Sequence, residues 1–126
     1  MSKTLSTLGL RHLALFTIHF DAMVHFYRDV VGMKVVWQPD ADNIYLSSGT
    51  DNLALHRKDN SPTQAGRLDH LGFAIETKEE VDRWHQHLKD AGVEIKAAPR
   101  DHRDGTRSFY CLDPDANLVQ FIYLVG

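Results

Sequence analysis

Among the side chains of this 126-residue chain that can bind metal ions, four recur in two pairs. His12 and His70 each follow a charged residue and precede a leucine, and they are 58 residues apart. His56 and Gln120 are 64 residues apart and lie in later apolar segments. Three imidazoles and one amide oxygen suit Zn, Fe, Ni, Co or Mn. If the four side chains face one cavity, the sequence predicts a divalent metal site.

Further candidates, for contact with a substrate, are charged or aromatic residues near the end of the chain. Arg107 and Tyr110 begin a predicted strand, and we expect them to contact a substrate. His102 and Arg103 lie in the polar segment before that strand, with Arg100 close by. Such a loop can bind an anionic substrate, or it can be a solvated charged loop without that role. The remaining histidines lie on or beside predicted helices and are expected at the surface: His19, His25, His85 and His87.

The elements that must position these residues follow the same order twice. Alternating apolar residues predict strands, and three- and four-residue steps predict helices. The first set is a strand at 11–17, a helix at 21–31 and strands at 34–38, 43–48 and 53–57. The second set is a strand at 69–76, a helix after Thr77 and strands at 93–97, 106–112 and 118–124. Asp21 and Thr77 are predicted helix caps, and a polar loop at 59–67 separates the sets.

This order is βαβββ repeated, and an internal repeat constrains the fold. In our alignment of the two halves, Tyr45 matches Phe109 and His56 matches Gln120. A module of about 55 residues is too small to bury a good core alone, so the two modules of one chain, or modules from two chains, must pack together. We predict an α+β fold of two βαβββ modules related by a pseudo-two-fold, with an eight-stranded mixed sheet curled around a cleft. The whole chain, 1–126, is expected to form a single domain, with module 1 at about 9–60 and module 2 at about 68–126.

The amino-acid composition limits the kinds of partner that the protein is expected to bind. The formal net charge is −3 and the basic residues form no block, so neither nucleic acid nor a membrane surface is expected as a partner. Cys111 is the single cysteine, which excludes an intrachain disulfide and fits a reducing cytoplasm. The N-terminal residues lack the apolar run of a signal peptide. These observations favour a cytoplasmic protein that binds a small molecule.

Three segments resemble the vicinal oxygen chelate superfamily, which includes glyoxalase I, extradiol dioxygenases and the fosfomycin- and bleomycin-resistance proteins. They are FYRDVVGMKVV (26–36), DHLGFAI (69–75) and SFYCLDPDANLVQFIYL (108–124). The resemblance extends from about Gly9 to Leu124. It implies that His12, His56, His70 and Gln120 fall on the four metal-ligand positions, and that the protein forms a homodimer.

Two residues depart from the family pattern. Gln120 stands where most metal-dependent members have Glu, so the ion would keep its full charge and favour an anionic substrate or hydroxide. With no acidic residue at either last-strand position, ordinary glyoxalase I activity is not expected. Ala116 replaces the glycine of the family's closing turn. We expect that change to be mild, because a type I turn tolerates alanine.

The resemblance implies metal-assisted chemistry on a small molecule chelated through neighbouring oxygens. The reaction type stays open among isomerase or lyase, dioxygenase and thiol transfer, and no catalytic residue is assigned. An alternative is a sequestration protein of the bleomycin-resistance kind, with no metal and no catalysis. Its cleft would have aromatic walls formed by Trp37, Tyr45, Phe109 and Tyr110.

Overall fold

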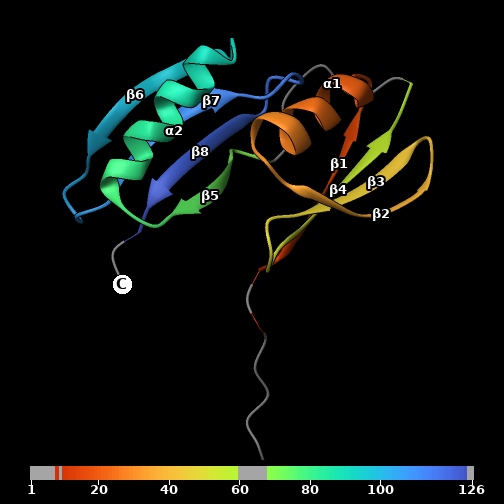
Figure 1. The fold of residues 1–126 in the computed structure, drawn as a ribbon, viewed down its shortest axis with the longest axis horizontal. Helices are drawn as coiled ribbons and strands as arrows, with labels where there is room; N and C mark the ends of the chain where they lie inside the picture. The colour runs from red at the N-terminus through yellow and green to blue at the C-terminus, as the bar shows by residue number, and fades with distance from the viewer. Residues whose placement is uncertain (1–7, 9, 60–67, 125–126) are drawn as a thin grey trace, which may run out of the picture.

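The computed structural model describes residues 8, 10–59 and 68–124, and it confirms the two βαβββ modules (Figure 1). Module 1 contains β1 (His12–Thr17), α1 (Phe20–Val24), its continuation η1 (His25–Val30), β2 (Lys34–Asp40), β3 (Asn43–Ser47) and β4 (Asn52–Arg57). Module 2 contains β5 (Leu71–Ile75), α2 (Lys78–Asp90), β6 (Ile95–Asp101), β7 (Arg107–Leu112) and β8 (Leu118–Tyr123). Most of the predicted loop at 59–67, together with residues 1–7 and residue 9 near the N-terminus, lies outside the described residues.

The eight strands form two four-stranded sheets, in the orders β1-β4-β3-β2 and β5-β8-β7-β6. In each sheet the first strand of the module is parallel to the last, and the other neighbours are antiparallel. Among the described residues no strand of one sheet pairs with a strand of the other. Consequently β1 and β5 lie at the outer edges of their sheets, and the cleft predicted inside one curled sheet is not closed within a single chain.

The two helices begin in different ways. Thr77 caps α2 as predicted, because its Oγ1 accepts a hydrogen bond from the Glu80 backbone N–H at 3.1 Å. The first helix starts one residue before the predicted cap, and Asp21 lies inside its first turn, where a carboxylate is favoured by the helix dipole. Its second half, η1, has the wider π-helical turn, shown by the Val31 N–H bonding to the Phe26 carbonyl at 2.9 Å. No helix in the described residues is long and apolar enough to cross a membrane.

The modules meet on the sides of their sheets that carry the helices. Tyr27 in η1 donates a hydrogen bond to Asp113 after β7 at 2.7 Å. His87 in α2 donates to the carbonyl of Val30 at 2.9 Å. Burial and the charge of Asp113 raise the pKa of Tyr27 well above its ordinary value. Burial also raises the pKa of Asp113, although its hydrogen bonds from Asn117 and Tyr27 oppose the rise.

The opposite face of each sheet is open. In β1 the side chains of His12, Ala14 and Phe16 are exposed, while those between them turn towards the helix and the core. We call these surfaces open face 1, on module 1, and open face 2, on module 2. Because side chains alternate along a strand, the parity of each residue decides whether it belongs to the core or to an open face.

The turn between β7 and β8 corrects one expectation. Ala116 has φ of +66°, in the left-handed region that disfavours residues with a Cβ by about 1–2 kcal/mol. Asp113 maintains this turn by accepting hydrogen bonds from the backbone N–H groups of Asp115 and Asn117, at 2.9 and 2.8 Å. The prediction that alanine is well tolerated here is therefore wrong, since the turn adopts the backbone conformation of the glycine it replaces.

Candidate functional site

The strand registers correct the alignment of the two modules. In module 1, Ala14 pairs with Ala54 and Phe16 pairs with His56. In module 2, Gly72 pairs with Gln120. Gly72 and Ala14 each lie two residues after the histidine of their module, so Ala54 is the counterpart of Gln120. The prediction that His56 and Gln120 occupy the same place is wrong by two residues.

The same correction applies to the aromatic residues. Tyr45 pairs with Ala54, and Tyr110 pairs with Gln120, so Tyr45 and Tyr110 are counterparts. Phe109 is fully buried on the helix side of β7, where it stacks on Phe121 with ring centroids 5.2 Å apart. It cannot line a cleft wall as predicted, because a shift of one residue along a strand moves a side chain to the other face.

Gln120 is fixed at the centre of open face 2. Its side-chain nitrogen donates to the Tyr110 hydroxyl at 3.0 Å and to the Ser108 hydroxyl at 3.2 Å. With both amide hydrogens engaged, the amide oxygen turns towards β5 and lies over Gly72. A Cβ at Gly72 would be 3.6 Å from that oxygen. The missing side chain therefore leaves the oxygen accessible beside the strand that follows His70.

Each histidine of the predicted set is held through the same ring nitrogen. Nδ1 of His12 bonds to Oδ1 of Asn52 at 2.8 Å, and Nδ1 of His70 bonds to Oδ1 of Asp69 at 2.5 Å. For His56 the partner is Asn43, at 2.6 Å. These oxygens are acceptors, so Nδ1 carries the proton and Nε2 keeps its lone pair. Metal-binding histidines are oriented in this way, so each ring presents a nitrogen of the kind that binds divalent ions.

Open face 1 is aromatic. Trp37 stacks on Tyr45 with centroids 5.1 Å apart, and Tyr45 meets the edge of His56 at 5.9 Å. Phe16 lies 6.1 Å from the His56 ring. Trp37 is 58% exposed and Phe16 is 61% exposed, which is unusual for large apolar side chains on one sheet. The surface can therefore stack on a flat ligand or be covered by another protein surface.

The predicted substrate contacts are divided between two surfaces. Tyr110 lies on open face 2, with its ring 5.5 Å from that of His70. Arg107 lies on the helix side, where it donates to Asp82 of α2 at 2.8 and 3.1 Å. Three residues apart on one strand, Arg107 and Tyr110 have opposite parity. Arg107 therefore lies on the other side of the sheet from Tyr110, and Arg103 is an exposed residue of the β6–β7 turn. Substrate contacts by Arg107, Tyr110 and Arg103 remain predictions.

Ser108 was missed by the sequence analysis. It is 2% exposed, and its hydroxyl lies 2.9 Å from Nε2 of His102 as well as beside the Gln120 amide. Its even spacing from Tyr110 could have placed it on the same face. His102 belongs to a tight turn, shorter than the predicted polar segment, because β6 continues to Asp101.

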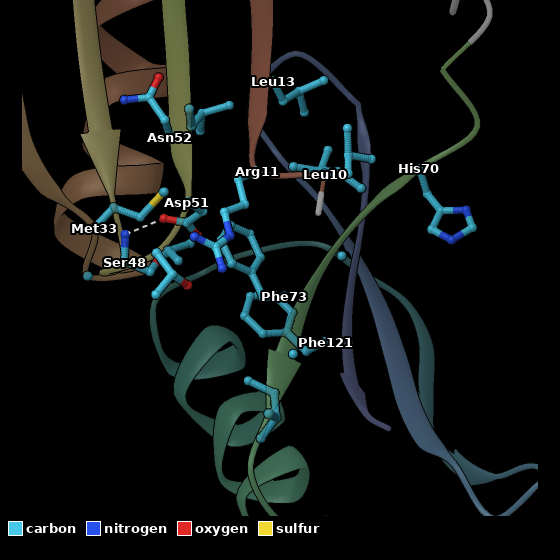
Figure 2. Close-up of a pocket in the computed structure, with 18 of the residues that line it drawn as sticks. Leu10, Arg11, Leu13, Met33, Ser48, Asp51, Asn52, His70, Phe73 and Phe121 are labelled. Atoms are coloured by element: carbon cyan, nitrogen blue, oxygen red, sulfur yellow. Dashed lines mark hydrogen bonds between the residues drawn. The ribbon is translucent and has the colours of Figure 1, made fainter. Parts of the chain in front are cut away.

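The predicted ligands do not come together in one chain. Among the described residues, no three or more His, Cys, Asp or Glu side chains are close enough to hold a metal. A cavity of about 870 Å³ lies between the modules, and His12 and His70 line it together with Phe73, Trp84 and Phe121. Figure 2 shows the His70 ring turned away from Arg11 and Asp51 of that cavity. Convergence of His12, His56, His70 and Gln120 remains a prediction.

Known proteins share this sequence pattern. Residues 9–121 match the model of the Glyoxalase/Bleomycin resistance protein/Dioxygenase superfamily. The metallothiol transferase FosB of Staphylococcus saprophyticus is 29% identical over 112 residues, which cover 86% of this chain and 72% of that protein. The manganese-dependent 2,3-dihydroxybiphenyl 1,2-dioxygenase of Geobacillus genomosp. 3 is 31% identical over 85 residues. That match covers 68% of this chain but 26% of the dioxygenase.

Solved structures share the fold. An integron cassette protein from the mobile metagenome of the Halifax Harbour sewage outfall superposes with a TM-score of 0.80 at 22% identity, covering 94% of this chain and all of the other. Lactoylglutathione lyase from Agrobacterium tumefaciens superposes with a TM-score of 0.77 at 24% identity, covering 93% and 94%. At these identities the likeness concerns the fold. Together with the family match, it shows that the chain belongs to the Glyoxalase/Bleomycin resistance protein/Dioxygenase superfamily.

Proposed function

We propose that the protein is a metal-dependent enzyme whose small-molecule substrate binds the ion through two neighbouring oxygens. His12, His70 and Gln120 would hold the ion, which belongs to the group Zn, Fe, Ni, Co or Mn. One observation carries the proposal: both imidazoles are held through Nδ1 with Nε2 left open, and the amide oxygen of Gln120 is turned towards β5. His56 lies two residues beyond the ligand position and would instead face the substrate.

The bound ion would act as a Lewis acid that stabilises negative charge developing on a substrate oxygen. Because Gln120 is neutral, these three side chains leave the charge of the ion uncompensated and favour an anionic substrate. The Tyr110 hydroxyl accepts a hydrogen bond from Gln120, so its own proton is available to donate to a substrate oxygen. The reaction would be dioxygenation or thiol transfer, the activities named in the dioxygenase and FosB relatives.

The proposed site is completed by a second copy of the chain. His12 lies on open face 1, whereas Gln120 lies on open face 2, and the two sheets are not joined in the described part of one chain. β1 and β5 are sheet edges, and exposed edges are normally covered in native proteins. A two-fold dimer would set open face 1 of each chain against open face 2 of the other.

Mixing two inactive variants tests the shared site. We expect that His12→Ala and His70→Ala each abolish metal binding as homodimers. In a mixed dimer, the His12→Ala chain keeps His70 and the His70→Ala chain keeps His12, so one complete site is restored. Co-expression with separable affinity tags (cleaved off before metal analysis) isolates the mixed dimer. One ion per mixed dimer supports the proposal, whereas a mixed dimer that binds no metal contradicts a site shared between chains.

A second candidate function is sequestration without catalysis, and the exposed stack of Trp37 on Tyr45 favours it. Such a surface suits a flat aromatic or cationic compound. Metal analysis of protein purified without a histidine tag separates the two functions. Stoichiometric divalent metal supports the enzyme. Metal-free protein that binds aromatic compounds with a change in Trp37 fluorescence supports sequestration.

A further inference from the structure

We propose that His102 is a positioning residue that orients the Gln120 amide through the hydroxyl of Ser108. The inference rests on the proposed function, because it concerns which atom of Gln120 is presented to the metal. It assigns a role to the β6–β7 turn, which is distant from His12 and His70 in sequence. The role depends on three hydrogen bonds that connect His102, Ser108, Gln120 and Tyr110.

The direction of these bonds follows from what each atom can donate. The Gln120 nitrogen has two hydrogens and donates them to Tyr110 and Ser108. A hydroxyl that accepts from the amide must send its own proton elsewhere. For Ser108 the His102 Nε2 atom is 2.9 Å away, and it accepts that proton when Nδ1 carries the ring hydrogen. The protons therefore point in one direction, from Gln120 to Ser108 to His102.

Ser108 is 2% exposed, so bulk water does not readily take the place of His102 as an acceptor. Without the imidazole, the Ser108 proton would turn to the nearest strong acceptor, which is the Gln120 oxygen after the amide rotates by about half a turn. That rotation would direct the amide nitrogen over Gly72. A nitrogen that carries two hydrogens cannot bind a cation, so the proposed third ligand would be lost.

The turn holds His102 in place. Its backbone N–H donates to the carbonyl of Thr106 at 2.9 Å, and its own carbonyl accepts from Gly105 at 3.0 Å. Asp104 accepts from the Thr106 backbone and hydroxyl at 3.0 and 2.7 Å. Gly105 has φ of +88°, which suits glycine and closes the turn between β6 and β7. His102 therefore approaches Ser108 from a fixed direction.

The test compares His102→Phe with His102→Gln by metal titration. Phenylalanine keeps a ring but offers no acceptor, whereas glutamine restores one. We expect His102→Phe to weaken metal binding roughly fivefold, the effect of about one net hydrogen bond, and His102→Gln to recover most of it. His25→Phe, an exposed histidine on the other module, is the matched control and should leave affinity unchanged.

The Gln120→Glu background decides between orientation and simple structural support. A carboxylate has two equivalent oxygens and no orientation to set. In that background His102→Phe should have no effect on metal affinity. An equal loss in both backgrounds, or no loss in either, would overturn the proposal.

A metal-free measurement separates this inference from the proposed function. In the apo protein, the side-chain amide protons of Gln120 should exchange slowly with solvent and have shifted NMR frequencies, and both features should diminish in His102→Phe. If they do while no variant binds metal, the positioning role stands and the metal function fails. If the Gln120 amide signals are the same in wild type and His102→Phe, the positioning role fails.

Discussion

The two open faces have the same backbone topology but differ in chemistry. At equivalent positions, Ala54 stands on open face 1 and Gln120 on open face 2. Around Gln120 the face is a hydrogen-bonded polar network that includes Ser108 and Tyr110. Around Ala54 it is aromatic, with an exposed Trp37 stacked on the partly buried Tyr45. The repeat has thus kept one histidine per module, His12 and His70, while the surroundings have diverged.

This difference indicates separate roles for the two faces in the proposed site. Open face 2 can fix the orientation of a metal ligand because both hydrogens of the Gln120 side-chain nitrogen are engaged in hydrogen bonds. Open face 1 supplies one imidazole, His12, and a broad surface on which a flat substrate can stack. If the faces combine across two chains, each site has a polar half and an aromatic half.

The largest expected effect is an absence of activity. Ordinary glyoxalase I activity is expected to need an acidic residue at a last-strand position, and neither Ala54 nor Gln120 is acidic. We expect negligible turnover of the methylglyoxal–glutathione adduct with Ni, Co, Zn or Mn, far below the usual enzyme median of about 10 per second. The assay follows product absorbance. Turnover near that median would show that another residue supplies the base.

The next prediction compares a histidine from each face. His70→Ala should abolish binding of a divalent ion, because it removes one of three proposed ligands. His56→Ala should change affinity by roughly twofold or less, since His56 pairs with Phe16, two residues beyond the ligand position. Calorimetry of both variants measures the difference. Equal losses would return His56 to the metal site and remove the distinction between the two faces.

Removing a hydrogen bond between the modules should have a smaller effect, on stability and not on metal binding. Tyr27→Phe removes the donor to Asp113, which is 4% exposed. We expect a loss of about 1–3 kcal/mol in the free energy of unfolding, because the buried carboxylate loses one of its hydrogen-bond donors and keeps those from Asp115 and Asn117. Urea denaturation measures it, with Tyr45→Phe on open face 1 as the tyrosine control. An unchanged urea midpoint of unfolding would mean that this hydrogen bond does not stabilise the contact between the modules.

The smallest effect concerns the corresponding turns of the two modules. Gly49 has φ of +134° between β3 and β4, whereas Ala116 has φ of +66° between β7 and β8. Ala116→Gly should stabilise the protein by about 0.5–1 kcal/mol, since relief of the backbone strain exceeds the extra entropy of glycine. Gly49→Ala should destabilise it. Thermal unfolding of both variants checks the signs, and a destabilised Ala116→Gly would contradict the strain.

Sequence reasoning succeeded where the signal was local. The repeat, the strands and the Thr77 cap follow from periodicity and from a pairing three residues apart, and all are present in the structure. It failed where register decided the outcome. The pairs Tyr45–Phe109 and His56–Gln120 share an offset of 64 residues, which suggested that the members of each pair are equivalent. The strand pairings instead make Ala54 the counterpart of Gln120, two residues before His56.

The remaining misses have the same cause. Arg107 and Tyr110 are close in sequence but face opposite sides of β7, where Asp82 holds Arg107. The bond between His102 and Ser108 depends on the exact length of β6, which extends beyond the predicted strand. The positive φ of Ala116 depends on the hydrogen bonds that Asp113 accepts in its turn, which turn preferences alone do not predict.

The most direct test of the metal site is a calorimetric titration of untagged wild type and Gln120→Glu with divalent ions at about pH 7.5, where most imidazoles are neutral. We predict that wild type binds one ion per chain. Gln120→Glu should bind more tightly, by a few kcal/mol at most, because the added charge must also be desolvated. If wild type binds no divalent ion while Gln120→Glu does, His12, His70 and Gln120 do not form a metal site, and sequestration becomes the better account of the protein.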